Sequence, residues 1–190
     1  MDKKINNQSV HGYAITYIQE DAKVGDKGTS SDIDSYSLSL YRAFSQGNNN
    51  YFEGILGLSE LDITNIRRSG NNTLNGTRKG QQIFGSLQAI NTFKNKQTEV
   101  SPNVRLDLGY TILDAYSEIG TNPLKYDEQT VETIGIYGGI NLSNEINKED
   151  YIFRPSVALE LGYDLSPDSD VSLNYISDPN TKYTKSIDQE

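Results

Sequence analysis

The side chains with the greatest capacity for chemistry in this sequence are charged residues that alternate with aliphatic ones. Arg105 and Asp107 stand two positions apart, and Arg154 and Glu160 recur in a similar stretch further along. Paired carboxylates serve as general acid and base, whereas opposite charges on neighbouring strands form ion pairs that fix the register. The arginines among the carboxylates favour the second interpretation, a ladder of ion pairs to which Glu53 also belongs.

Other catalytic and metal chemistry finds little support. His11 is the single histidine and cysteine is absent, which rules out the usual zinc sites and every disulfide. We find no glycine-rich phosphate loop and no nucleophile elbow. The acidic stretch 164–170 lacks the spacing of a known calcium loop. We therefore expect no catalytic residue, no cofactor and no bound metal.

The charged residues lie on segments with a clear two-residue period. In 104–110, the positions on one side of an extended strand are Val104, Leu106, Leu108 and Tyr110, and those on the other are Arg105, Asp107 and Gly109. The segment 157–163 repeats nearly the same pattern, with Glu160 on its polar side. Such a strand separates an oily environment from a wet one.

The same alternation predicts an all-β protein, and its strands run in an antiparallel, up-and-down meander. The expected strands are 11–18, 35–44, 51–61, 81–93, 102–116, 130–143, 151–165 and 171–187. Many of them exceed the usual 5 to 6 residues of globular sheets and match the length of a tilted membrane strand. The expected connections alternate between long and short, as they do in outer-membrane barrels.

These patterns assign each side chain to one of two faces. The residues expected to face lipid are Leu38, Leu40, Leu56, Leu58, Leu106, Leu108, Val157, Leu159 and Leu161. The residues expected to face a wet lumen are Glu53, Arg105, Asp107, Arg154 and Glu160. Tyrosines near strand ends predict an aromatic girdle at the membrane interface, formed by Tyr13, Tyr36, Tyr110 and Tyr163.

Composition agrees with a single domain of this kind. The 190 residues are 35% hydrophobic, with 16 glycines and 13 tyrosines, which is typical of a turn-rich β protein. A net charge of −9 argues against nucleic acid as a partner. No apolar run approaches the roughly 18 residues of a membrane helix, and the start of the chain does not read as a signal peptide.

The chain resembles the translocator domain of autotransporters, the type V secretion family. The resemblance covers about residues 11–183 and rests on the order and spacing of FEGILG at 52–57, GQQIFG at 80–85, RLDLGY at 105–110, YDEQT at 126–130, LGYDL at 161–165 and SDPN at 177–180.

The resemblance implies a transmembrane barrel of twelve strands in a Gram-negative outer membrane, of which this chain carries about eight in a partial domain spanning 1–190. Its implied partners are outer-membrane lipid, its own N-terminal passenger, which is absent here, and the barrel-assembly machinery. The family's final strand with its terminal aromatic residue is not found at 187–190. Some members cleave their passenger with acidic side chains in the lumen, where Glu53, Asp107 and Glu160 would point. We interpret these carboxylates as part of the ladder and expect no enzyme.

Two alternatives remain open at this point. The first is a self-contained eight-stranded outer-membrane barrel that acts through its long loops as an adhesin or stabiliser. The second is a soluble β-barrel that holds a small apolar ligand, with its aliphatic face turned inward.

Overall fold

The computed structural model describes residues 2–6, 9–24, 28–148 and 150–188, and all regular structure in these ranges is β-strand. Within them, no helix is long and apolar enough to cross a membrane. The strands are β1 (Asp2–Asn6), β2 (Ser9–Val24), β3 (Thr29–Gln46), β4 (Asn50–Ser69), β5 (Asn72–Asn91), β6 (Phe93–Asn95), β7 (Thr98–Leu113), β8 (Tyr116–Ser117), β9 (Leu124–Tyr126), β10 (Gln129–Asn144), β11 (Ile146–Asn147), β12 (Ile152–Phe153), β13 (Ser156–Asp164), β14 (Ser169–Tyr175) and β15 (Asp178–Ile187).

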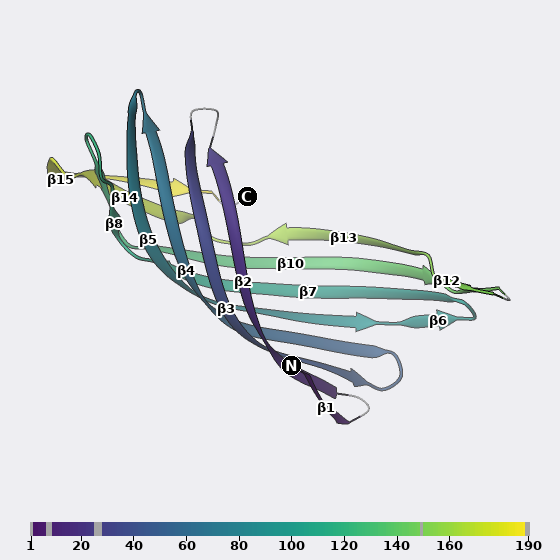
Figure 1. The fold of residues 1–190 in the computed structure, drawn as a ribbon. Helices are drawn as coiled ribbons and strands as arrows, with labels where there is room; N and C mark the ends of the chain where they lie inside the picture. The colour runs from purple at the N-terminus through teal and green to yellow at the C-terminus, as the bar shows by residue number, and fades with distance from the viewer. Residues whose placement is uncertain (1, 7–8, 25–27, 149, 189–190) are drawn as a thin grey trace.

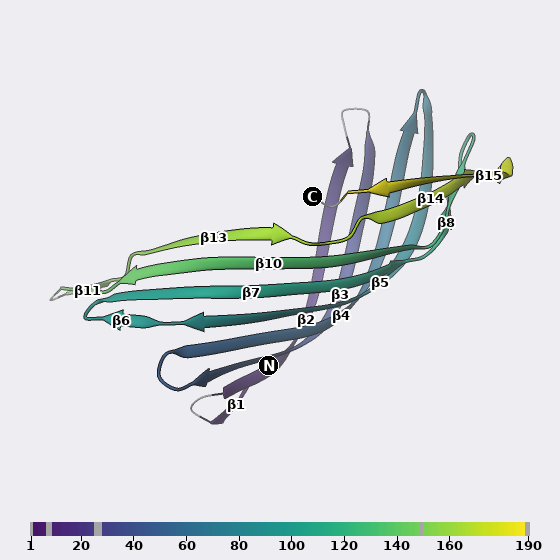
Figure 2. The same cartoon turned by 180° about the vertical axis from the view of Figure 1, so that it is seen from behind.

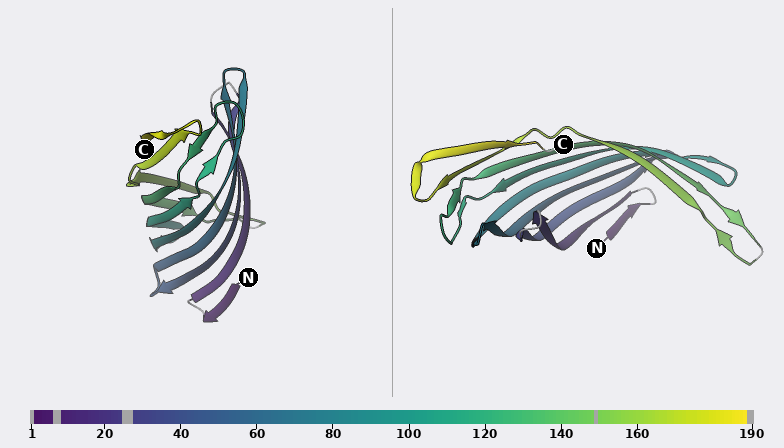
Figure 3. Two further views of the ribbon diagram at one scale, coloured as in Figure 1. Left: turned by 90° about the vertical axis from the view of Figure 1, so that its left-hand side faces the viewer. Right: turned by 90° about the horizontal axis from the view of Figure 1, so that it is seen from above.

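One large antiparallel sheet dominates the molecule. Its strand order is β1-β2-β3-β4-β5-β7-β10-β13, and the short β6 also pairs with β7. Each long strand pairs with the next one along the chain, which is the up-and-down meander that the sequence predicts. The sheet is a single curved layer that does not close on itself (Figures 1, 2 and 3). In the described residues, β13 pairs along one edge only.

Two segments that we expected to be loops, 19–34 and 62–80, are instead largely strand. β2 and β3 continue to a turn at Gly28, and β4 and β5 continue to a turn at Gly70, where φ is 77° and 59°. The strand register persists through these ends, as Asp62 opposite Lys79 shows. The alternation of the band does not continue into these ends, because charged residues such as Asp62 take over the apolar face and the aliphatic residues Leu61 and Ile63 lie on the opposite face. The ends of β4 and β5 rise at the top of Figure 1, at the opposite end of the sheet from the turn between β3 and β4.

The last expected strand, 171–187, is not a strand of the large sheet. It folds as the hairpin β14–β15, and β14 also pairs with β9, which in turn pairs with β8. These four strands form a separate small sheet in the order β15-β14-β9-β8. Here β8 and β9 come from the long connection between β7 and β10, so the alternation of 171–176 marks a strand outside the main wall.

The protein has little conventional core because the large sheet has no second layer. The buried hydrophobic side chains among the described residues are Ile63, Leu74 and Leu124. Leu74 lies on β5 and Leu124 on β9, where the small sheet meets the projecting β4–β5 hairpin. Packing of the ordinary globular kind is therefore confined to this junction.

Candidate functional site

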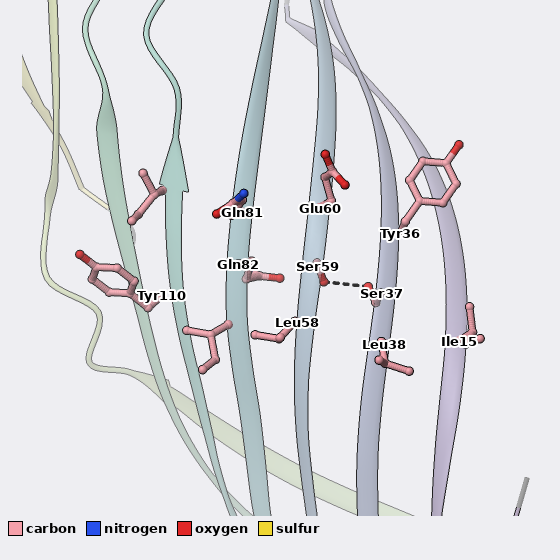
Figure 4. Close-up of a pocket in the computed structure, with 12 residues that line it drawn as sticks. Ile15, Tyr36, Ser37, Leu38, Leu58, Ser59, Glu60, Gln81, Gln82 and Tyr110 are labelled. Carbon is pink, nitrogen blue, oxygen red and sulfur yellow. Dashed lines mark hydrogen bonds between the residues drawn. The ribbon is translucent and has the colours of Figure 1, made fainter.

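The two faces of the large sheet form the candidate site. On one face, which we call the apolar face, aliphatic side chains stand in register across the strands: Ile15, Leu38, Leu58, Ile83 and Tyr110 form one such row. A groove of about 690 Å³ runs along this row (Figure 4). Neighbouring rows are also largely apolar, so the face is continuous from β2 to β13.

Exposure differs sharply between the two faces. On the apolar face, Leu40 is 63% exposed and Leu58 is 60% exposed, whereas on the opposite face Ser39 is 5% and Thr111 is 8% exposed. Side chains fan apart on the convex side of a curved sheet and crowd together on its concave side. The apolar face is therefore convex, and the opposite face, which we call the polar face, lines the hollow of the sheet.

Eight of the nine aliphatic residues that the sequence assigns to lipid are strongly exposed on the apolar face, and Leu106 there has intermediate exposure. The eight are Leu38, Leu40, Leu56, Leu58, Leu108, Val157, Leu159 and Leu161.

The apolar band shifts steadily along the strands. The register partner of Leu40, followed through β4, β5 and β7, is Ile134 on β10. Leu38 and Leu40 are the middle of the band on β3, but on β10 the apolar positions run from Ile134 to Leu142. The shift is roughly one residue per strand, which corresponds to a strand tilt of about 35° for a rise of about 3.4 Å and a spacing of about 4.8 Å. Membrane barrels tilt their strands by about 35–45°.

The four tyrosines expected in a girdle all lie on the apolar face, and all four are exposed. Tyr36 also packs against Tyr17, with ring centroids 4.9 Å apart, and the Tyr17 hydroxyl donates to Asp34 Oδ1 at 2.5 Å. Tyr36 and Tyr110 flank the groove in Figure 4. Beyond Tyr36 the same face becomes charged, because Glu60 and Asp62 follow on β4 and both lie within 4 Å of Lys79. Tyr17 and Tyr36 thus mark a sharp boundary between apolar and charged surface, whereas Tyr13 lies opposite Leu40 in the middle of the apolar band.

The polar face carries a hydrogen-bonded network centred on Arg105. Its guanidinium donates to both carboxylate oxygens of Glu160 at 3.1 and 3.2 Å, and to Asp107 at 3.1 Å. Asp107 also accepts a 2.5 Å hydrogen bond from Ser86. The ring of Tyr137 lies 4.2 Å from the Arg105 guanidinium carbon. The network links β5, β7, β10 and β13 across the hollow of the sheet.

The structure does not bring all five expected ladder residues together. Glu53 is exposed on β4 and is not an ion-pair partner of Arg105, which pairs with Asp107 and Glu160. Arg154 lies between β12 and β13, outside the strands, and its ion pair is with Glu145 at 2.8 Å. Arg154 is therefore not part of the Arg105 network, because it precedes the start of β13 at Ser156 and its carboxylate partner is Glu145. The Arg154 guanidinium holds the pKa of the Glu145 carboxyl below its usual value.

Sequence reasoning missed the aromatic residues that pack over glycines on the polar face. A Cβ atom on Gly57 would lie 2.2 Å from the Phe84 ring, and one on Gly162 would lie 2.6 Å from the Tyr137 ring. Tyr137 covers Gly135 in the same way. Phe84 and Tyr137 are large aromatic residues at positions where the alternation predicts small or polar side chains. This departure from the pattern is the signal that could have identified them in the sequence.

The small sheet is attached to the projecting β4–β5 hairpin by a buried ion pair. Arg67 donates to the Glu118 carboxylate at 2.6 and 2.7 Å, and the Glu118 side chain is 4% exposed. Tyr116 stacks on Tyr126 at 4.6 Å and covers Gly76. Burial raises the pKa of the Tyr116 hydroxyl, and the nearby Tyr126 and Glu118 add to the shift. This junction fixes the 114–128 connection against the polar face.

The described side chains include no group of three or more His, Asp or Glu residues placed to hold a metal ion. The chemistry of the two faces is therefore that of partitioning and hydrogen bonding: one face suits an apolar solvent, and the other suits water and polar groups.

The sequence signature of the family described as Autotransporter beta-domain matches residues 1–190. The chain belongs to the autotransporter beta-domain family. Domains of this family are outer-membrane β-barrels that serve transport, so the chain is a component of a bacterial outer membrane. The expected family, location and all-β antiparallel fold are confirmed. The match does not favour either the self-contained small barrel or the soluble ligand-binding barrel.

Solved structures show the same fold. The translocator domain of autotransporter NalP from Neisseria meningitidis matches with a TM-score of 0.72 at 14% identity, over 90% of this chain and 64% of that one. The ferric citrate transporter FecA in its unliganded form matches with a TM-score of 0.51 at 11% identity, over 97% of this chain and 30% of that one. The autotransporter chain thus spans less than two thirds of the NalP domain. No curated protein sequence matches it.

Proposed function

We propose that this chain forms part of the wall of an autotransporter barrel, which anchors an N-terminal passenger in the outer membrane and helps to export it to the cell surface. The observation that carries the proposal is the tilted, continuous apolar band on the convex face, set against a hydrogen-bonded polar face in the hollow. The first face suits lipid, and the second suits a hydrated channel with a polypeptide in it.

The parts of the chain that extend beyond the apolar band orient the wall in the membrane. β3 and β4 join through the tight turn 47–49, whereas the opposite end carries the projecting hairpins and the small sheet. Outer-membrane barrels place short turns in the periplasm and long connections outside. We therefore assign the 47–49 end to the periplasm and the small sheet to the cell surface.

The Arg105 network has a structural role in this proposal. Its charged side chains are between 28% and 41% exposed, so water screens the ion pairs, which set the register of the strands more than they add stability. Neither Asp107 nor Glu160 acts as a catalytic acid here, because both are engaged by Arg105. The barrel-assembly machinery is the proposed partner that inserts the strands into the membrane.

The test compares one residue from each face of β7. Leu108→Arg places a charge on the apolar band and should cost about 2–4 kcal/mol of folding free energy in lipid near the bilayer centre. Asp107→Asn on the polar face should have a mild effect, because Arg105 keeps its bonds to Glu160. Folding of the intact autotransporter into lipid vesicles is followed by heat-dependent gel migration. Equal damage from both changes would contradict the assignment of the faces.

A further inference from the structure

Arg42 is an unexpected residue on the apolar face. It lies on β3 directly opposite His11 on β2 and Gly54 on β4, and all three share that face with Leu40. Its side chain is exposed, and its guanidinium carbon lies 5.4 Å from the centre of the Phe44 ring, one pleat nearer the 47–49 turn. A cation on a lipid-facing surface is costly at the bilayer centre and tolerated near an interface.

The position of Arg42 corresponds to the periplasmic edge of the band. Phe44 and Phe52 stack beyond it, with ring centroids 5.3 Å apart, and the polar Gln46 and Asn50 follow. Paired aromatic rings of this kind mark the membrane interface. The Arg42 guanidinium is therefore within reach of lipid headgroups, because a long side chain extends toward the polar region.

No carboxylate among the described residues lies within ion-pair distance of Arg42. Elsewhere on the large sheet, Arg105 and Arg67 each engage a carboxylate. Arg68 and Arg78 form no ion pair within the described residues, but both donate to hydroxyl or carbonyl oxygens of the chain. Arg42 instead has an aromatic ring beside it and an imidazole opposite it. This leaves its hydrogen-bond donors open to an anion from outside the chain.

An apolar groove begins at Arg42. It holds about 630 Å³, and its lining includes Gly54 and Ala89 together with the polar residues Glu53, Gln88 and Arg105. Its apolar lining includes Phe44, Phe52, Leu87, Val104, Leu106 and Ile136. A cation at one end of an apolar groove on a lipid-facing wall is complementary to an amphiphile with an anionic head.

We propose that Arg42 and this groove bind one anionic glycerophospholipid of the periplasmic leaflet. The guanidinium donates to the phosphate oxygens, His11 offers a second polar contact, and an acyl chain lies in the groove over Gly54. The proposal rests on the proposed function, which makes this face lipid-exposed and this end periplasmic. The bound lipid would fix one point of the barrel wall at a set depth in the membrane.

The experiment measures lipid retention by the intact autotransporter in detergent, using native mass spectrometry with added phosphatidylglycerol or phosphatidylcholine. Arg42→Gln should weaken phosphatidylglycerol binding roughly fivefold, the effect of one basic residue at an anionic surface. Arg42→Lys keeps the charge and should fall between Arg42→Gln and the unaltered protein. Arg68→Gln is the matched control, because Arg68 is an exposed arginine at the opposite end of β4.

The outcomes separate this inference from the proposed function. Heat-dependent gel migration reports folding of each variant in lipid, so a protein that never inserts would overturn the proposed function itself. Insertion with equal phosphatidylglycerol binding by the unaltered protein and Arg42→Gln would overturn only the lipid site. Equal losses in Arg42→Gln and Arg68→Gln would also overturn it, since they would show general charge attraction.

Discussion

At the scale of single residues, shape matters as much as polarity on the hollow side of the sheet. Phe84 and Tyr137 are large rings on a face otherwise made of small and polar side chains, and each occupies the space above a glycine on the next strand. The glycines are visible in the sequence, but the ring that covers each one depends on cross-strand register. Register is a property of the folded sheet, so this pairing could not be predicted from one strand at a time.

Gly57→Ala should destabilise the barrel by about 1–3 kcal/mol, because the new methyl group occupies the position of the Phe84 ring and forces it to move. The measurement is the midpoint of urea unfolding of the intact protein in lipid vesicles. Gly138→Ala is the control, since a Cβ atom there meets nothing within 4 Å. Adding Phe84→Leu to Gly57→Ala should recover part of the loss. Similar effects at Gly57 and Gly138 would contradict the packing argument.

At the scale of elements, alternation predicted the strands within the membrane band and failed beyond it. Strands 35–44 and 51–61 were placed correctly inside β3 and β4, because one face there is apolar and the other is not. Past Tyr36 and Glu60 the apolar face becomes charged, and the aliphatic residues Leu61 and Ile63 lie on the opposite face, so the alternation no longer continues in phase. The hairpin β14–β15 shows the opposite error. Its alternating residues predicted a strand of the membrane wall, but they form part of a small sheet outside the membrane band.

The Arg67–Glu118 ion pair should hold the small sheet in place. Glu118→Gln removes the buried charge and should cost about 2 kcal/mol of local stability, less than for a fully buried pair because Arg67 is 30% exposed. Amide exchange at Ile119, which donates to Asn75 at 2.7 Å, should then be roughly thirtyfold faster.

Glu145→Gln is the matched control for this change, because the Arg154–Glu145 pair has a similar distance of 2.8 Å but is exposed. Exposed pairs contribute little, so exchange at Ile119 should stay the same in that variant. Unchanged exchange in Glu118→Gln would show that stacking of Tyr116 on Tyr126, and not the ion pair, attaches the small sheet.

At the scale of the whole molecule, the dominant fact is that the described sheet is curved but open. β13 pairs with β10 on one side only, although its side chains include Val157, Leu159 and Leu161, which carry the apolar band. In hydrocarbon, every backbone group left without a hydrogen bond costs several kcal/mol. A lipid-facing strand therefore needs a neighbour on both sides.

The 190 residues produced alone should for this reason fail to form a stable pore. In planar bilayers we expect no steady conductance level, and in vesicles we expect no heat-resistant folded band, whereas the intact autotransporter should give both. The strand tilt and the chain's 64% span of the NalP domain both favour a wall that other strands complete. A discrete, long-lived conductance from the 190 residues would instead mean that β13 meets the opposite edge, and that the smaller closed barrel forms.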